Sequence, residues 1–228
     1  MTFPRPYPIL APMEKIGILG GTFDPVHLGH LIPAQYACDF LALDRLILVP
    51  SATPVHRPRH HPASDQHRLA MCSLAAASLP TFDVSDIETT RPEPSYTALT
   101  LGSLKERFGS ATRLILLVGE DNLPLLHTWW HIKEILSLAT VAIMPRPAPA
   151  PARLGPLRAV LGDHAVDALI ASRVPSPLIP ITATDIRNRV GRGLPILGMV
   201  PASVAEYIAH TGLYRNDGFT RPRGPVPP

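Results

Sequence analysis

Short apolar runs alternate along the chain with segments whose apolar residues recur every three or four positions. The first run, residues 16–19, is followed by two glycines, which is typical of a buried parallel strand. Similar runs predict strands at residues 45–49, 82–87, 114–118 and 141–144. The helical spacing predicts helices near residues 28–41, 64–79, 98–108, 132–138 and 201–212.

The first two predicted helices, residues 28–41 and 64–79, contain residues that indicate where each helix begins and which side faces inward. Pro33 suits the first helix only if it lies in the first turn, where no proline N–H is needed. Ser64 is a candidate N-cap for the second helix. The residues expected on the inward side of that second helix are Leu69, Cys72, Ala76 and Leu79.

Strands that alternate with helices predict an α/β fold, namely a Rossmann-like parallel sheet with helices on both faces. Ligands of such sheets bind at the carboxyl ends of the strands, and the first glycine pair occupies such an end. We expect a single domain over residues 14–215, with a C-terminal helical part from about residue 182. The proline-rich ends, residues 1–13 and 216–228, are expected to be disordered tails.

Composition narrows the class of protein. With 46% hydrophobic and 17% charged residues, and no apolar run of membrane-spanning length, a globular cytoplasmic protein is expected. Prolines interrupt the first dozen residues, which argues against a signal peptide. Cys38 and Cys72 fall on predicted apolar helix faces and are expected to be buried thiols. The net charge of +3 comes from scattered arginines, which disfavours a nucleic-acid partner.

The segment after the first strand, residues 20–30, has the features of a phosphate site. Its glycines let a ligand approach the backbone, and the helix that begins near residue 28 presents free N–H groups to anions. His27 and His30 lie three positions apart, so both rings can face one point and donate to phosphoryl oxygens. From the residues alone, a metal pair completed by Asp24, or two surface histidines, are also open.

The string GGTFDPVHLGH, residues 20–30, resembles the first signature of the nucleotidyltransferase superfamily, and more narrowly that of bacterial nicotinate-nucleotide adenylyltransferases. The string ITATDIR, residues 181–187, resembles the second signature, with threonine in place of serine. Thr182 or Thr184 is expected to cap a helix that, with Arg187, holds the ATP triphosphate. The ATP-binding residues that the resemblance implies are Gly20, Gly21, Thr22, Phe23, Asp24, His27, Gly29, His30, Arg146, Thr182, Thr184 and Arg187.

The middle of the chain resembles the same adenylyltransferases where they meet the second nucleotide. Residues 94–101 resemble their Ser-Tyr-Thr segment, residues 119–130 their Gly-x-Asp and Trp segment, and residues 53–57 a Pro-Pro-His loop less one proline. An indole can stack on a pyridine ring, although Trp129 and Trp130 are also consistent with core or rim aromatics. Four histidines, at positions 56, 60, 61 and 67, are interpreted as part of a loop rather than a metal cluster. The mononucleotide-binding residues that the resemblance implies are Thr53, His56, Tyr96, Thr97, Asp121 and Trp129.

The resemblance implies an enzyme of NAD biosynthesis that joins ATP to nicotinate mononucleotide and releases pyrophosphate. The attacking phosphate is largely dianionic at neutral pH, so no side chain is needed as a base. His27, His30 and Arg187 are expected to be catalytic, with Mg²⁺ bound through ATP rather than by protein ligands alone.

Other functions remain open at this point. A related transferase could use nicotinamide mononucleotide, phosphopantetheine or a polyol phosphate. A non-catalytic nucleotide sensor is a further alternative, which the intact set of His27, His30 and Arg187 disfavours. The expected partners are the two nucleotides, without nucleic acid or membrane, and monomer or homo-oligomer is left open.

Overall fold

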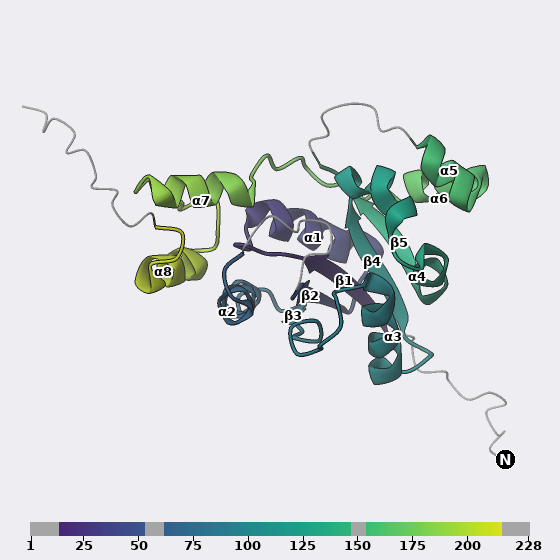
Figure 1. Ribbon diagram of the computed structural model, residues 1–228, viewed down its shortest axis with the longest axis horizontal. Helices are drawn as coiled ribbons and strands as arrows, with labels where there is room; N and C mark the ends of the chain where they lie inside the picture. Colours follow the sequence, from purple (N-terminus) through teal and green to yellow (C-terminus); the bar gives the residue numbers. More distant parts are fainter. Residues whose placement is uncertain (1–13, 53–61, 147–153, 216–228) are drawn as a thin grey trace, which may run out of the picture.

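The described residues of the computed structural model, 14–52, 62–146 and 154–215, form a five-stranded parallel sheet in the order β3–β2–β1–β4–β5 (Figure 1). The predicted α/β Rossmann-like class is therefore confirmed. The strands are β1 (Lys15–Gly21), β2 (Arg45–Pro50), β3 (Phe82–Val84), β4 (Arg113–Gly119) and β5 (Ala139–Met144).

Both faces of the sheet are covered, and this explains the unbroken apolar runs. Side chains alternate along a strand, so Leu46 and Leu48 of β2 join the core on one face while Ile47 and Val49 join the core on the other. All four side chains are at most 2% exposed. Double burial of this kind is the reason why the strands lack the alternating polar pattern of a half-exposed sheet.

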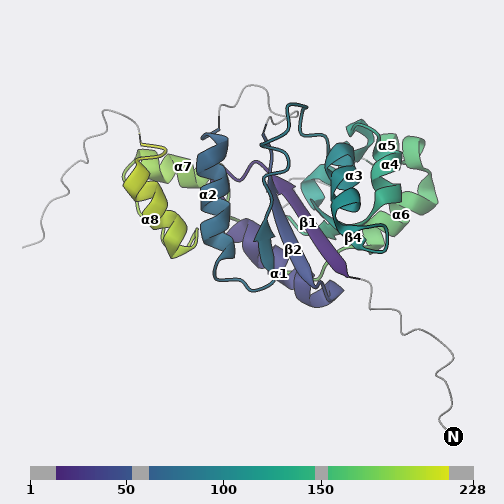
Figure 2. The same cartoon turned by 90° about the horizontal axis from the view of Figure 1, so that it is seen from below.

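The helices divide between the two faces. One face is covered by α1 (Leu28–Leu41) and α2 (Asp65–Ala76), and the C-terminal helices extend this layer. Figure 2 shows α2 between the sheet and α8. The C-terminal pair is α7 (Ala183–Gly191) and α8 (Ala202–Thr211). The opposite face carries α3 (Thr97–Phe108), the 3₁₀ helix η1 (Glu120–Thr128), α4 (Ile132–Leu138), α5 (Gly155–Leu161) and α6 (Asp163–Ala171).

The order of the strands reverses between β1 and β4, which are neighbours in the sheet. After β1 the chain enters α1 on one face, and after β4 it enters η1 on the other. Connections that leave on opposite faces create the crevice where such sheets bind ligands. Its floor is expected between the ends of β1 and β4, at Gly20, Gly21 and Gly119.

Pro33 lies deeper in its helix than the sequence suggested. It is in the second turn of α1, which begins at Leu28, and not in the first. A proline there cannot donate to the carbonyl four residues earlier, that of Gly29. Instead, Arg146 Nη1 donates to this carbonyl at 3.1 Å. A side chain from just beyond β5 thus replaces the missing backbone donor.

The end of α2 also differs from the prediction. Ser64 caps the helix as expected, because its side chain accepts a hydrogen bond from the His67 N–H. The helix ends at Ala76 and not at Leu79. Pro80 follows, and the residue before a proline is disfavoured in helical backbone.

The inward face of α2 is rotated relative to the prediction. Arg68, Met71 and Cys72 are fully buried, whereas Leu69 is only half-buried. An arginine therefore occupies a core position. The two cysteines are buried free thiols, as expected, and Cys38 lies with Cys72 in the core on this face of the sheet.

Several further features were not predicted. The helices η1, α5 and α6 lie in segments where prolines and glycines hid the helical spacing; Gly162, for example, ends α5 and precedes α6. The strand β3 stops at Val84, and the Asp86 carbonyl then accepts the N–H groups of Thr89 and Thr90 in a turn. Among the described helices, none combines the length and the apolar character needed to cross a bilayer. Both predicted tails lie outside the described residues.

Candidate active site

A cleft of about 320 Å³ lies at the carboxyl ends of β1 and β4. Residues 20–30, the first motif, and residues 181–187, the second motif, both contribute to its walls although they are far apart in sequence. The predicted site residues that line it are Gly20, Gly21, Thr22, Phe23, Asp24, His30, Thr97, Asp121, Trp129, Arg146 and Arg187.

A larger cavity of about 590 Å³ lies between α7 and α8. Its lining is mainly apolar, with side chains such as Val190, Leu194 and Ile208, and it includes no residue of either motif. A binding site is distinguished by converging polar groups rather than by size alone. The smaller cleft is therefore the candidate active site.

Two glycines of the first motif permit unusually close packing. A Cβ on Gly21 would lie 3.1 Å from the ring of Phe23, which itself has a positive φ of 49°. A Cβ on Gly29 would lie 2.7 Å from the Ile181 carbonyl oxygen and 2.9 Å from His27 Nδ1. The start of α1 therefore meets the second motif at a distance that only glycine allows.

The two histidines stack on each other, with ring centroids 3.7 Å apart and planes inclined by 26°. His30 lines the cleft and packs edge-on against Phe23, whereas His27 is 2% exposed and does not line it. We expected both rings to face the ligand, but only the His30 ring faces the cleft. Within the described part of the chain, neither ring's Nδ1 has a hydrogen-bond partner.

Both rings are neutral in this setting. Burial and, to a smaller extent, the charge of Arg146 lower the pKa of His27 to about 3. Burial, followed by the adjacent His27 ring and the charge of Arg146, lowers the pKa of His30 well below its ordinary value. A neutral imidazole keeps one N–H donor, so His30 can bind a phosphoryl oxygen, while positive charge must come from the arginines.

Arg146 supplies a cation beside these histidines. Its Nη1 is held by the Gly29 carbonyl, and burial lowers the pKa of the guanidinium while the charge of Asp121 opposes that effect. A Cβ on Gly119 would lie 2.5 Å from Asp121 Oδ1 and 3.4 Å from Arg146 Nε. Glycine at the end of β4 therefore lets both side chains lie against the backbone at the crevice.

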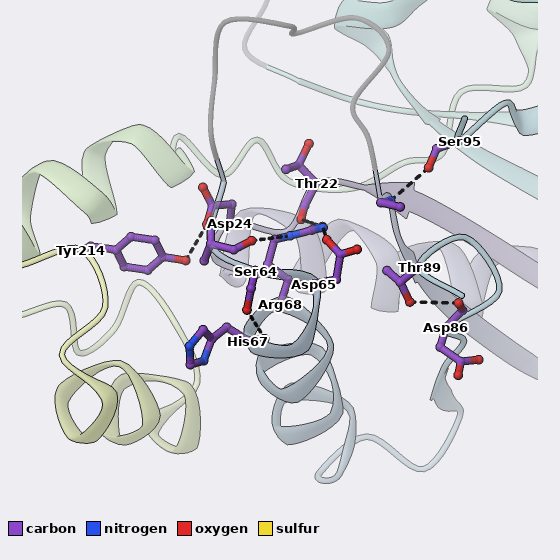
Figure 3. A network of polar contacts seen from close by, with 12 residues as sticks. Thr22, Asp24, Ser64, Asp65, His67, Arg68, Asp86, Thr89, Ser95 and Tyr214 are labelled. Atoms are coloured by element: carbon purple, nitrogen blue, oxygen red, sulfur yellow. Dashed lines mark hydrogen bonds and ion pairs between the residues drawn. The ribbon is translucent and has the colours of Figure 1, made fainter. Parts of the chain in front are cut away.

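Asp24 connects the first motif to three other segments and is 2% exposed. Its Oδ1 accepts hydrogen bonds from Tyr214 Oη at 2.7 Å and from the Ala63 N–H at 3.1 Å (Figure 3). Its backbone carbonyl accepts from Arg187 Nη1 at 2.7 Å, and its Oδ2 lies 3.6 Å from the same nitrogen. Asp24 therefore ties the first motif to the segments that contain Ala63, Arg187 and Tyr214.

In the second motif, Thr182 caps α7, because its Oγ1 accepts from the Asp185 N–H at 3.1 Å. Thr184 has a different role, since its Oγ1 accepts from Arg187 Nη2 at 3.2 Å. Neither threonine lines the cleft, whereas Ala183 and Arg187 do. The first turn of α7 and the Arg187 guanidinium therefore face the cleft.

A second pocket of about 300 Å³ adjoins the other side of the cleft, and Trp129 lies between the two and lines both. Thr97 is the first residue of α3, one position before the predicted start of this helix, and also lines both. Tyr96 lines only the adjoining pocket and stacks on Trp130, with centroids 5.0 Å apart. Trp130 is 41% exposed and is a rim aromatic.

Two predicted residues, Thr53 and His56, lie outside the described residues, as do the histidines at 60 and 61. The remaining histidine of that set, His67, lies with its Nδ1 2.9 Å from Tyr207 Oη. In the ranges that the structure describes, no group of three or more His, Cys, Asp or Glu side chains is placed to hold a metal ion.

Arg68 is a residue of the site's framework that the sequence reasoning missed. It is fully buried, donates from Nη1 to the Thr22 carbonyl at 2.8 Å and from Nε to the Ala63 carbonyl at 3.0 Å, and pairs with Asp65 (Figure 3). Its spacing of four residues from Cys72 placed it on the inward side, but an arginine in a helix is ordinarily assigned to the surface.

Glu88 and Thr100 also line the cleft and were not predicted. Thr100 Oγ1 donates to Glu88 Oε1 at 2.6 Å, and both residues are buried. Thr100 lies three residues after Thr97 on α3, so its position on the same helix face was available from the sequence. Nothing in the sequence around Glu88 indicated a buried carboxylate.

The chain matches a family model described as cytidylyltransferase-like over residues 18–189. A nicotinate-nucleotide adenylyltransferase of Roseiflexus castenholzii is 39% identical over 201 residues, which cover 88% of this chain and 98% of the relative. One from Thermomicrobium roseum is 41% identical over 203 residues, which cover 89% and 92%.

Solved structures show the same fold. A nicotinate-nucleotide adenylyltransferase from Vibrio parahaemolyticus superposes with a TM-score of 0.63 at 21% identity, over 90% of this chain and 97% of its own. The Plasmodium falciparum nicotinic acid mononucleotide adenylyltransferase complexed with NaAD gives a TM-score of 0.66 at 16% identity, over 88% and 97%.

Proposed function

The chain belongs to the cytidylyltransferase-like family and, within it, to the nicotinate-nucleotide adenylyltransferases, and on this premise we propose how its cleft holds the two substrates. The enzyme joins ATP to nicotinate mononucleotide in NAD biosynthesis. One observation supports the arrangement most directly: His30 and Arg187, from distant motifs, line the same cleft as Trp129. ATP lies between the two motifs, and the mononucleotide lies toward Trp129.

In the proposed reaction, an oxygen of the mononucleotide's 5′-phosphate attacks the α-phosphorus of ATP in line with the leaving group. A new P–O–P bond forms, the bond between the α-phosphorus and the bridging oxygen breaks, and pyrophosphate leaves with that electron pair. The nucleophile is already largely dianionic, because the second pKa of a phosphate monoester is about 6. Consequently no protein base takes part, and the protein aligns two anions and stabilises the charge of the leaving group.

The side chains around the cleft suit these tasks. His30, held neutral by burial, donates an N–H to the phosphates, and His27 supports its ring from behind by stacking. Arg146 and Arg187 supply the positive charge, each with one Nη atom fixed to a backbone carbonyl of the first motif. The N–H groups at the start of α7 add donors for the β- and γ-phosphates.

Mg²⁺ is proposed to enter with ATP. The Oδ1 atom of Asp24 already accepts two hydrogen bonds, and His30, Arg146 and Arg187 line the cleft with donors that suit phosphate oxygens. Bound to the phosphates, the ion would neutralise part of the charge on pyrophosphate.

The mononucleotide end is assigned to three residues. Trp129 is placed for stacking on the pyridine ring, and the N–H groups at the start of α3, beside Thr97, have no side-chain cap and suit the ring carboxylate. Asp121, in the first turn of η1 just after β4, suits a ribose hydroxyl. Because Cys38 and Cys72 are free thiols, we place the enzyme in the reducing cytoplasm.

The test is pyrophosphate release from ATP, measured with nicotinate mononucleotide, with nicotinamide mononucleotide, with phosphopantetheine and without an acceptor. We expect the highest kcat/KM with nicotinate mononucleotide. A higher value with another acceptor would contradict the substrate assignment, and binding of ATP without pyrophosphate release under any condition would favour a sensor. Omission of Mg²⁺ should abolish the reaction.

A further inference from the structure

Tyr214 joins the far end of the described chain to the first motif. It follows α8, has a positive φ of 63°, and donates a hydrogen bond from its Oη to Asp24 Oδ1 at 2.7 Å. Figure 3 shows its ring pointing from the segment after α8 toward Asp24. Burial, followed by the charge of Asp24, raises the pKa of Tyr214, so its hydroxyl remains a donor at physiological pH.

The carboxylate that Tyr214 binds also faces Arg187. Asp24 Oδ2 lies 3.6 Å from Arg187 Nη1, and the same nitrogen donates to the Asp24 backbone carbonyl. Each hydrogen bond that a carboxylate accepts stabilises its negative charge, so a carboxylate that accepts fewer hydrogen bonds attracts a nearby guanidinium more strongly. The hydrogen bond from Tyr214 therefore fixes the orientation of the Asp24 carboxylate and reduces its attraction for Arg187.

We propose that Tyr214 is a positioning residue for ATP, which acts through Asp24 to keep the Arg187 guanidinium directed at the cleft. This inference rests on the proposed role of Arg187 in binding the ATP phosphates. Without the Tyr214 hydroxyl, the carboxylate turns more of its charge toward Arg187, and the guanidinium becomes less available to the triphosphate.

The chain offers a matched control in Tyr207, on α8. Its Oη lies 2.9 Å from His67 Nδ1, so Tyr207→Phe also removes one hydrogen-bonded hydroxyl from the same C-terminal region, but not beside Asp24 or Arg187. If Tyr214 merely holds the C-terminal segment in place, both substitutions should have similar effects on ATP binding.

The experiment is calorimetric titration of the full chain with ATP and Mg²⁺ in the absence of mononucleotide. We expect Tyr214→Phe to raise the Kd for ATP by about fivefold to tenfold, which is the size of a typical net hydrogen-bond contribution. Tyr207→Phe should change it less than twofold. Equal effects of the two substitutions, or a change below twofold in Tyr214→Phe, would overturn the proposal.

Two further backgrounds test whether the effect passes through Asp24 and Arg187. Added to Arg187→Ala, or to Asp24→Asn, the Tyr214→Phe substitution should change the Kd by less than twofold, since coupled residues are not additive. If Tyr214→Phe raises the Kd for ATP as much in either background as in the wild type, its effect does not pass through Asp24 and Arg187. If Arg187→Ala itself leaves the Kd unchanged, the proposed ATP site fails as well; if it weakens ATP binding while Tyr214→Phe does not, only this inference fails.

Discussion

Gly29 lies so close to the second motif that a Cβ on it would be 2.7 Å from the Ile181 carbonyl oxygen. Two segments that are distant in the sequence therefore meet at the first turn of α1. The contact is between backbone atoms, so a side chain at residue 29 cannot be accommodated by a change of rotamer.

This closeness predicts opposite effects for two glycine-to-alanine substitutions in helices. In general, alanine in a helix interior is more stable than glycine by about 0.5–1 kcal/mol. Gly102→Ala in α3 should follow this rule, because a Cβ there meets no atom within 4 Å. Gly29→Ala should instead lower the free energy of unfolding and kcat/KM. Chemical denaturation and the pyrophosphate assay measure the two effects, and a stabilised, fully active Gly29→Ala protein would contradict the close contact.

His30 is the histidine that lines the cleft, and its removal should lower kcat by about 10²-fold or more, as loss of a preorganised donor does elsewhere. The matched control is His210→Ala, since that residue is exposed in the last turn of α8 and does not line the cleft. Steady-state kinetics of both variants measure the effect. Near-normal turnover in His30→Ala would refute the assignment.

The lowered pKa of His27 predicts how stability depends on pH. The unfolded chain titrates this histidine near pH 6.5, whereas the folded protein titrates it at about 3. The unfolded state therefore binds the extra proton first as the pH falls, so the stabilisation is complete above pH 6.5 and declines below it, by up to about 1.4 kcal/mol per pH unit per group. Thermal melts from pH 7.5 to 5 should show a declining Tm.

A His27→Gln variant should show a shallower decline in Tm over the same pH range, because it lacks the buried imidazole. A slope that is unchanged in His27→Gln would mean that other groups cause the pH dependence.

Substitution of Arg68 should lower the free energy of unfolding. Arg68→Met leaves two part-buried backbone carbonyls of the site without their donors, which should cost about 1–3 kcal/mol each, and it also removes the partner of Asp65, whose side chain is 41% exposed. The comparison is Arg45→Met, because the Arg45–Asp83 pair is roughly half exposed and should be worth about 0–1 kcal/mol. Urea denaturation measures both, and equal losses would contradict the structural role of Arg68.

The sequence was most informative where local pattern and burial agree. The strand that contains Leu46–Val49 is apolar on both sides because both faces are covered, and the Gly-rich turn lies where a parallel sheet binds ligands. Both motifs were recognisable, and the structure brings residues of both, including His30 and Arg187, to one cleft.

Other features depend on contacts that no local pattern records. Arg68 looks like a surface residue until the carbonyls that it binds are known, and Pro33 fits its helix because of Arg146. Stacking places His27 behind His30, although their spacing alone is compatible with two equivalent ligands. These features are set by tertiary structure, which overrides the local preference of each residue.

The hydrogen bond between Tyr214 and Asp24 has a consequence for synthesis of the chain. The two residues are separated by 190 positions, so a ribosome makes the first motif long before it makes the tyrosine that anchors it. Domains begin to fold from the N-terminus while they emerge. A nascent chain therefore contains the signature histidines early, and the hydrogen bond that holds Asp24 forms only after the tyrosine has left the exit tunnel.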